Sequence, residues 1–185
     1  TTGKVKFLDT ATTSNLTINS GTTVLPDLLT VKGNYTNNAL ATFSPEALTY
    51  FDSNSAQAID GTLSTTSAFG SVAFLGSGTK TLGSVASTSA LTVASGATLT
   101  TSLALSTTKA LTNNGTFTQG SVLELGGNFH NGGTFNDNSG TIKTQAYLSD
   151  YLAGRDRSGL GAGSTSTSRV KDMVSSGNYL YIAND

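Results

Sequence analysis

Residues 113–117 read Asn-Asn-Gly-Thr-Phe and residues 131–135 read Asn-Gly-Gly-Thr-Phe, so one pattern returns at an offset of 18. Gly and Asn tolerate the positive φ angles of tight corners, whereas Thr and aromatic residues favour strands. The pattern therefore predicts a short corner-and-strand unit that recurs along the chain.

Two longer comparisons give nearly the same repeat. Residues 16–24 (LTINSGTTV) resemble residues 91–99 (LTVASGATL) at an offset of 75, and residues 33–38 (GNYTNN) resemble residues 127–132 (GNFHNG) at an offset of 94. The offsets differ by 19, which indicates that the second copy contains one extra unit of that length. We therefore predict a repeating unit of 18 to 19 residues.

A unit this short, built from strand-length pieces between Gly and Asn, is typical of one coil of a β-solenoid. We predict an all-β fold in which residues 1–145 form a right-handed β-helix-like solenoid. It would contain roughly seven or eight coils and be about 35 Å long at about 4.8 Å per coil. An antiparallel β-sandwich or jelly roll is the alternative, because it also has short strands and turns and because residues 45–90 repeat poorly.

Alternation along the predicted strands indicates which side chains point inward. Those expected in the interior are Leu16, Ile18, Leu91, Val93, Leu103, Leu105, Leu123, Leu125, Phe43, Phe74, Phe117 and Phe135.

The composition excludes several classes of protein. Charged residues make 11% of the chain, against about 25% in an average soluble domain, while Ser and Thr together number 56 and Asn 14. The net charge of −1 and the absence of a basic cluster argue against nucleic acid as a partner. No apolar run is long enough to span a membrane, and without Cys there is no disulfide framework.

The Gly-Asn-aromatic-Thr-Asn and Leu-Thr-x-x-Ser-Gly-x-Thr patterns resemble the repeats of large bacterial surface proteins. These include autotransporter-like and haemagglutinin-like adhesin regions with β-helical folds, and the resemblance covers about residues 14–145. It implies a secreted or cell-surface location and a role in adhesion or scaffolding. Because Thr1 is not a native start, we expect a processed mature chain or an excised fragment.

The last forty residues differ in composition and pattern from the repeats. Residues 146–168 predict a short helical cap followed by a flexible Gly/Ser/Thr linker. Residues 169–185 predict a strand or hairpin, and they resemble the opening of an LVIVD-type β-propeller repeat. We expect this segment to be either a connector between subunits or the start of a truncated domain.

A strand on a flexible tether can pair with the open sheet edge of another molecule. The N-terminal residues alternate charged and apolar side chains, so they are a second candidate for such strand donation. Head-to-tail contacts that do not close generate filaments, so the expected partners are further copies of this chain, other surface proteins or glycans. The candidate contact residues are Val5, Phe7, Leu8, Val170, Met173, Tyr179, Leu180, Tyr181 and Ile182.

The sequence contains little that suggests catalysis. His130 is the only histidine and is expected at an exposed corner, and Glu46 and Glu124 are the only glutamates. Glycosidase chemistry needs paired carboxylates, and the aspartates are scattered singly. Residues 52–54 and 137–140 carry oxygen ligands that suit calcium, but neither matches the calcium-loop pattern. We therefore predict no enzyme activity and no cofactor.

The predicted function is that of an extracellular structural or adhesive module that assembles into filaments. The alternative is a module that binds glycans or ice. Rows of threonine would form outward ladders on a solenoid, as in β-helical ice-binding proteins, and exposed tyrosines would contact a glycan. The residues concerned are Thr98, Thr100, Thr101, Thr107, Thr108, Thr116, Thr118, Tyr35 and Tyr50.

Overall fold

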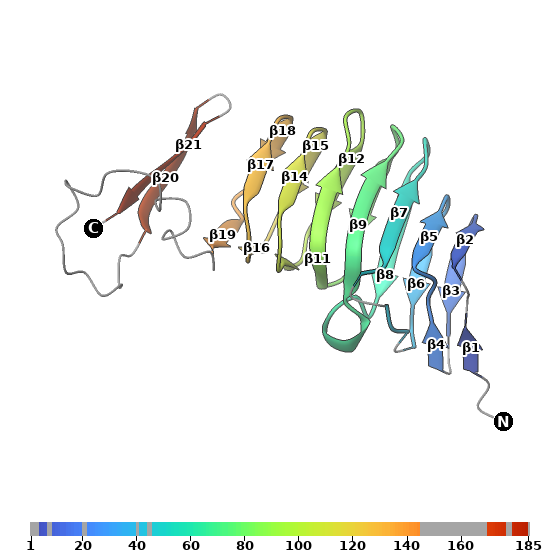
Figure 1. Ribbon diagram of the computed structural model, residues 1–185. Helices are drawn as coiled ribbons and strands as arrows, with labels where there is room; N and C mark the ends of the chain where they lie inside the picture. Colours follow the sequence, from blue (N-terminus) through green and yellow to red (C-terminus); the bar gives the residue numbers. More distant parts are fainter. Residues whose placement is uncertain are drawn as a thin grey trace. The chain divides into compact units, whose positions relative to one another are not determined.

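The computed structural model of the chain describes residues 4–6, 9–19, 22–39, 41–43, 46–144, 170–176 and 179–184. The chain divides into two compact units, Thr1–Ala146 and Tyr147–Asp185. The first unit is a β-solenoid of about seven turns, in which short strands lie side by side along the stack (Figure 1).

Successive turns of the solenoid, called coils here, contain two or three strands each. Coil 1 holds β1 (Lys4–Lys6), β2 (Thr10–Thr13) and β3 (Leu16–Ile18), and coil 2 holds β4 (Thr22–Val24), β5 (Leu28–Val31) and β6 (Tyr35–Asn37). Coil 3 holds β7 (Leu48–Asp52) and β8 (Gln57–Gly61), and coil 4 holds the 3-10 turn η1 (Thr65–Ser67), β9 (Phe69–Leu75) and β10 (Thr79–Leu82). Coil 5 holds β11 (Ala86–Val93) and β12 (Thr98–Thr101), and coil 6 holds β13 (Leu105–Thr107), β14 (Leu111–Asn113) and β15 (Thr116–Gln119). Coil 7 holds β16 (Val122–Leu125), β17 (Phe129–Asn131) and β18 (Thr134–Asn136), and β19 (Thr141–Thr144) follows it.

The strands form parallel walls. One wall is a seven-stranded sheet in the order β18-β15-β12-β10-β8-β6-β3, and another is a ten-stranded sheet that runs from β19 to β2. Strand β11 pairs with β13 through residues 86–88 and with β14 through residues 91–93, so the ten-stranded wall branches after coil 5. Every described strand pair of this unit is parallel, which confirms the solenoid. The sandwich alternative is wrong, because its sheets are antiparallel.

Coil length is not constant along the stack. Thr116 pairs with Thr134 at an offset of 18, and Ala86 pairs with Leu105 at an offset of 19, as the repeat predicts. In the middle of the chain the offset rises, because Leu48 pairs with Ser71 at an offset of 23 and Tyr35 pairs with Ile59 at an offset of 24. The extra residues lie in wider corners and in the segment that contains η1. They explain why residues 45–90 repeat poorly in the sequence.

The two long sequence comparisons matched strands on different walls. Leu16 lies in β3 of the seven-stranded sheet, whereas Leu91 lies in β11 of the ten-stranded sheet. Tyr35 and Phe129 are displaced in the same way. Because both comparisons change walls in the same direction, the error cancels in the difference of the offsets, which is one coil. Strands on different walls resemble one another because many of them alternate an apolar residue with a polar one, most often Thr.

One hydrophobic core runs through the coils. Most predicted inward side chains are buried, which agrees with the alternation along the strands. The prediction that Leu103 points inward is wrong, because this residue lies at a corner and keeps 41% of its surface exposed. Leu16, Phe43 and Phe135 are only partly buried at the margins of the core.

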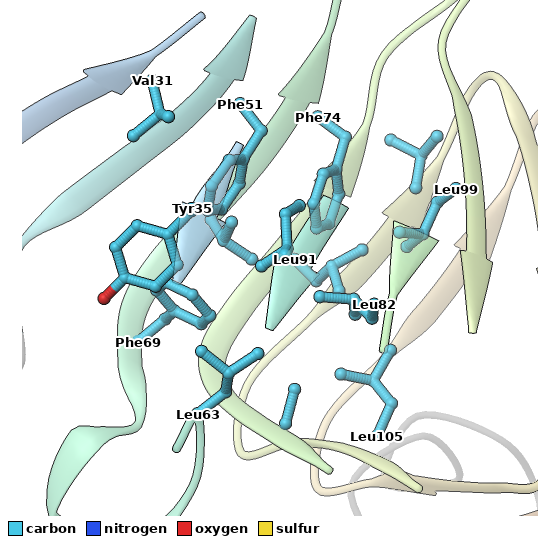
Figure 2. Packing of buried hydrophobic residues seen from close by; sticks show 14 of the residues in the cluster. Val31, Tyr35, Phe51, Leu63, Phe69, Phe74, Leu82, Leu91, Leu99 and Leu105 are labelled. Atoms are coloured by element: carbon cyan, nitrogen blue, oxygen red, sulfur yellow. The ribbon is translucent and has the colours of Figure 1, made fainter. Parts of the chain in front are cut away.

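Aromatic rings fill the core of coils 2–4. Figure 2 shows Tyr35, Phe51, Phe69 and Phe74 gathered together. Phe51 makes edge contacts with Tyr35 and Phe69 at centroid distances of 5.8 and 5.7 Å and stacks on Phe74 at 5.6 Å. Tyr35 is fully buried, so the expectation that its ring contacts a glycan is wrong.

The second unit contains an antiparallel hairpin of β20 (Val170–Ser176) and β21 (Tyr179–Asn184). Met173 pairs with Ile182, and Ser175 pairs with Leu180. A register shift lies between Val170 and Asp172. The helical cap and linker expected over residues 146–168 lie outside the described residues.

Candidate functional site: the threonine array of the seven-stranded sheet

Four neighbouring strands of the seven-stranded sheet carry threonine at the same two outward positions, with Asn136 as the one exception. The strands are β10, β12, β15 and β18, and their registers stack equivalent residues without an interruption. We call these eight residues the threonine array: a first column of Thr79, Thr98, Thr116 and Thr134, and a second column of Thr81, Thr100, Thr118 and Asn136.

The array is a regular grid of exposed or half-buried side chains. Neighbouring parallel strands lie about 4.8 Å apart, and residues two apart on one strand are separated by about 6.6 Å. The four strands therefore span about 14 Å across the sheet. Within the described part of the array, the one side-chain hydrogen bond runs from Asn136 Nδ2 to Thr118 Oγ1 at 3.4 Å. The threonine hydroxyls are accordingly available to an external partner.

The residues between the two columns point inward and hold the sheet on the core. They are Lys80, Leu99, Phe117 and Phe135, which stack on one another in register. Their size and charge vary widely while the outward positions remain hydroxyl or amide groups. This alternation fixes the outward direction of the array.

Lys80 is completely buried although it carries a charge. Its Nζ donates to the carbonyl oxygens of Ser53, Gly76 and Gly78 at 2.8, 2.9 and 2.9 Å. Burial lowers the pKa of the Lys80 ammonium, and the nearby Asp52 carboxylate opposes that shift. A charged residue of this wall is thereby kept off the outer surface, and three corner carbonyls that turn inward gain a donor.

Gln57, the stacked neighbour of Lys80, likewise donates hydrogen bonds to carbonyls of a corner. Gln57 pairs with Lys80 in the register, and its Nε2 donates to the carbonyl oxygens of Val31 and Gly33 at 3.0 and 2.6 Å. Sequence reasoning missed both residues as interior groups. Both lie between Thr or Ala residues that point outward. Because side chains alternate along a strand, this position indicated an inward direction even for a polar side chain.

Only part of the predicted threonine ladders points outward. Thr101 is buried and donates to the Leu103 carbonyl at 3.1 Å, and Thr107 is buried as well. These two residues face inward because they occupy the alternate positions of β12 and β13. Thr108 is exposed at the corner after β13, outside a strand. The prediction is confirmed for Thr98, Thr100, Thr116 and Thr118, whose outward positions lie in the array.

The other walls carry no equivalent grid in the described residues. The matching outward column of the ten-stranded sheet contains Thr12, Thr30, Tyr50, Ala73, Thr92, Thr112 and His130. A tyrosine, an alanine and a histidine therefore interrupt its threonines. The branch formed by β11, β13, β16 and β19 carries Ser87, Ser106, Glu124 and Lys143 outward.

The residues considered for catalysis lie apart on the walls and loops. His130 is exposed but lies in the middle of β17, where it pairs with Thr112, so its assignment to a corner is wrong. Glu124 forms an exposed ion pair with Lys143 at 3.6 Å, and Glu46 is exposed before β7. Among the described residues, no three acidic or histidine side chains are grouped so as to hold a metal.

The two loops considered for calcium form turns. Asn54 Oδ1 accepts hydrogen bonds from Ser77 N and Ser77 Oγ at 3.1 and 3.3 Å, which tie one coil to the next. In the second loop Gly140 N donates to the Asp137 carbonyl at 2.6 Å, and Asn138 and Ser139 adopt positive φ.

The candidate subunit-contact residues are described only in part. Val5 lies in β1 and pairs with Thr23 of β4, whereas Phe7 and Leu8 lie outside the described residues. The remaining six lie in the hairpin of the second unit: Val170, Met173, Tyr179, Leu180, Tyr181 and Ile182. Each of the two hairpin strands pairs with the other.

No family model, curated protein or solved structure matches the chain. Among the residues that the structure describes, no helix has the length and apolar character needed to cross a bilayer.

Proposed function

We propose that this chain is an extracellular structural and adhesive module at a cell surface and that it is not an enzyme. The observation that carries the proposal is an uninterrupted hydrophobic core beneath walls whose outer positions are mostly Thr, Ser and Asn. A stack in which each coil contacts its neighbours gives an extended scaffold with a large uncharged surface. The resemblance to adhesin-type repeats supports the same role.

The proposal includes assembly into filaments through the terminal segments. Strand β1 alternates charged and apolar residues, and β20 and β21 form a hairpin that follows the solenoid in sequence. Donation of such a strand to the sheet edge of another copy would join subunits head to tail. The likeness of residues 170–185 to the start of an LVIVD-type propeller repeat supports a different role, in which the hairpin opens a further domain.

Negative-stain electron microscopy of the purified chain tests the assembly. We expect filaments or end-to-end oligomers from the full chain and monomers from a variant without residues 169–185. A variant that replaces Glu46, Glu124 and His130 with alanine is the control, because we assign these residues no part in contacts between subunits or in catalysis. Monomers of the full chain at high concentration would show that the filament part of the proposal is wrong.

A ligand-binding role is the second candidate, and the threonine array is the observation that favours it. Glycan binding was expected to use Tyr35 and Tyr50, but Tyr35 lies in the core and only Tyr50 remains on an outer wall. The array is on the other sheet from Tyr50. Its chemistry, hydroxyl and methyl groups on a fixed grid, suits the ice alternative better.

A further inference from the structure

We propose that the threonine array binds the surface of ice. This inference rests on the ligand-binding candidate above and names its ligand, and it leaves the structural role of the solenoid unchanged. The array contains eight outward side chains on four in-register strands, and seven of these side chains are threonine.

A rigid grid can distinguish ice from liquid water. In ice, oxygen atoms occupy fixed rows, so a set of hydroxyls at fixed spacings can bond many of them at once. The array repeats at about 4.8 Å across strands and about 6.6 Å along them, dimensions comparable with the oxygen repeats on ice faces. Liquid water has no fixed positions to match, so it gains nothing from the regularity of the grid.

Each threonine supplies two groups that suit this ligand. The hydroxyl donates and accepts hydrogen bonds with water, and the methyl group orders the water around it. Threonine is also β-branched and therefore stiff at χ1, so little side-chain freedom is lost on binding. Two columns of such side chains present hydroxyls whose directions repeat from strand to strand.

The wall under the array is built to be rigid and uncharged on its outer side. No bulge interrupts the registers of β10, β12, β15 and β18. The charged residue of β10, Lys80, is directed inward and held by three carbonyls. A strongly hydrated ammonium is thus absent from the surface of the grid, where it would hold liquid water in place.

The array suits ice better than a glycan. Proteins commonly recognise sugar rings by aromatic contact, and none of the eight side chains is aromatic. None carries a charge for an acidic polysaccharide either. The outward tyrosine Tyr50 is on the ten-stranded sheet, between Thr30 and Ala73.

The test compares two double variants of the full chain in ice-recrystallisation and thermal-hysteresis assays. Thr100→Lys with Thr116→Lys places charges in the centre of the array. Thr92→Lys with Thr112→Lys is the control on the other wall, where these half-buried threonines lie outward on neighbouring strands and pair directly with each other. Circular dichroism and the thermal midpoint check folding, and Thr100→Ala with Thr116→Ala replaces the array variant if the lysines prevent folding.

We expect the native chain to inhibit recrystallisation, the array variant to lose this activity by about tenfold or more, and the control to keep it. An inactive native chain, or equal activity in the two variants, would overturn the inference. Glycan-array binding that depends on Thr100 and Thr116 without ice activity would also overturn it. These outcomes are separate from surface location and filament formation, which decide the structural proposal.

Discussion

Coils 3–4 and coils 5–7 place different residues at one stacked interior position of the seven-stranded sheet. The position is occupied by Gln57 and Lys80 in the first region and by Leu99, Phe117 and Phe135 in the second. The strands of coil 3 are offset by 23 from their partners in coil 4, whereas paired strands of coils 5–7 are offset by 18 to 20. The two regions differ in what this position must bond, because Gln57 and Lys80 donate to corner carbonyls and the three apolar residues do not.

The reason lies in the corners. In coils 3 and 4 the corners direct the carbonyls of Ser53, Gly76 and Gly78 toward the interior, where Lys80 bonds them. The corner after β11 closes on itself, because Ala97 N donates to the Ala94 carbonyl at 3.0 Å. An apolar residue is then sufficient at Leu99. Inward polar residues are therefore found where corner carbonyls turn inward, since buried carbonyls need donors.

The largest expected effect concerns the aromatic core of the long coils. Phe51→Ala should lower the free energy of unfolding by about 4 kcal/mol, because a fully buried ring in contact with three others leaves a cavity. Phe135→Ala, at a partly buried ring of coil 7, should cost about half as much. Urea unfolding measures both values, and equal losses would contradict the contrast between the two regions.

Lys80→Met is expected to lower the free energy of unfolding by about 3 kcal/mol, because three buried carbonyls lose their donor. Leu99→Met, one coil further in the same column, should cost less than about 1.5 kcal/mol because the volume is conserved. The same denaturation experiment checks the pair. If the two substitutions cost the same, the corner carbonyls do not need Lys80.

Tyr35→Phe should raise the free energy of unfolding by about 1 kcal/mol at neutral pH, because the buried Tyr35 Oη has no partner among the described residues. Burial raises the pKa of the Tyr35 phenol well above its ordinary value. The folded state therefore holds the phenol neutral, and it loses stability relative to the unfolded chain as pH rises above the unfolded pKa of about 10. The advantage of the variant should grow in thermal melts above pH 10. A constant difference would show that Tyr35 ionises in the folded state.

Glu124→Gln should change stability by less than about 0.5 kcal/mol, since the ion pair with Lys143 is largely exposed. A double-mutant cycle with Lys143→Gln isolates the pair. A coupling several times larger would mean that outward contacts, and not the interior, hold the last coils together.

The sequence allowed the coil to be predicted but not its irregularities. Residues 113–117 and 131–135 pair in register, so their offset of 18 was a direct measure of one coil. The long coils were hidden because their extra residues lie in corners and beside η1, where no apolar period marks them.

The candidate site was predicted in part. Thr98, Thr100, Thr116 and Thr118 were identified, but Thr79, Thr81 and Thr134 were not. Thr79 and Thr81 were missed because Lys80 breaks the apolar alternation that reveals a strand. The inward direction predicted for Phe135 was a signal that Thr134 points outward. Thr101 and Thr107 were assigned outward although they face inward, since threonine is compatible with both sides of a strand. Tyr35 was assigned to the surface because a phenol normally keeps a polar partner.

Labelling of intact native cells with an antibody raised against residues 46–144 tests the central claim most directly. The proposed surface module predicts label on the outside of unbroken cells, with no increase after permeabilisation. Label that appears only after the cells are opened would contradict the account.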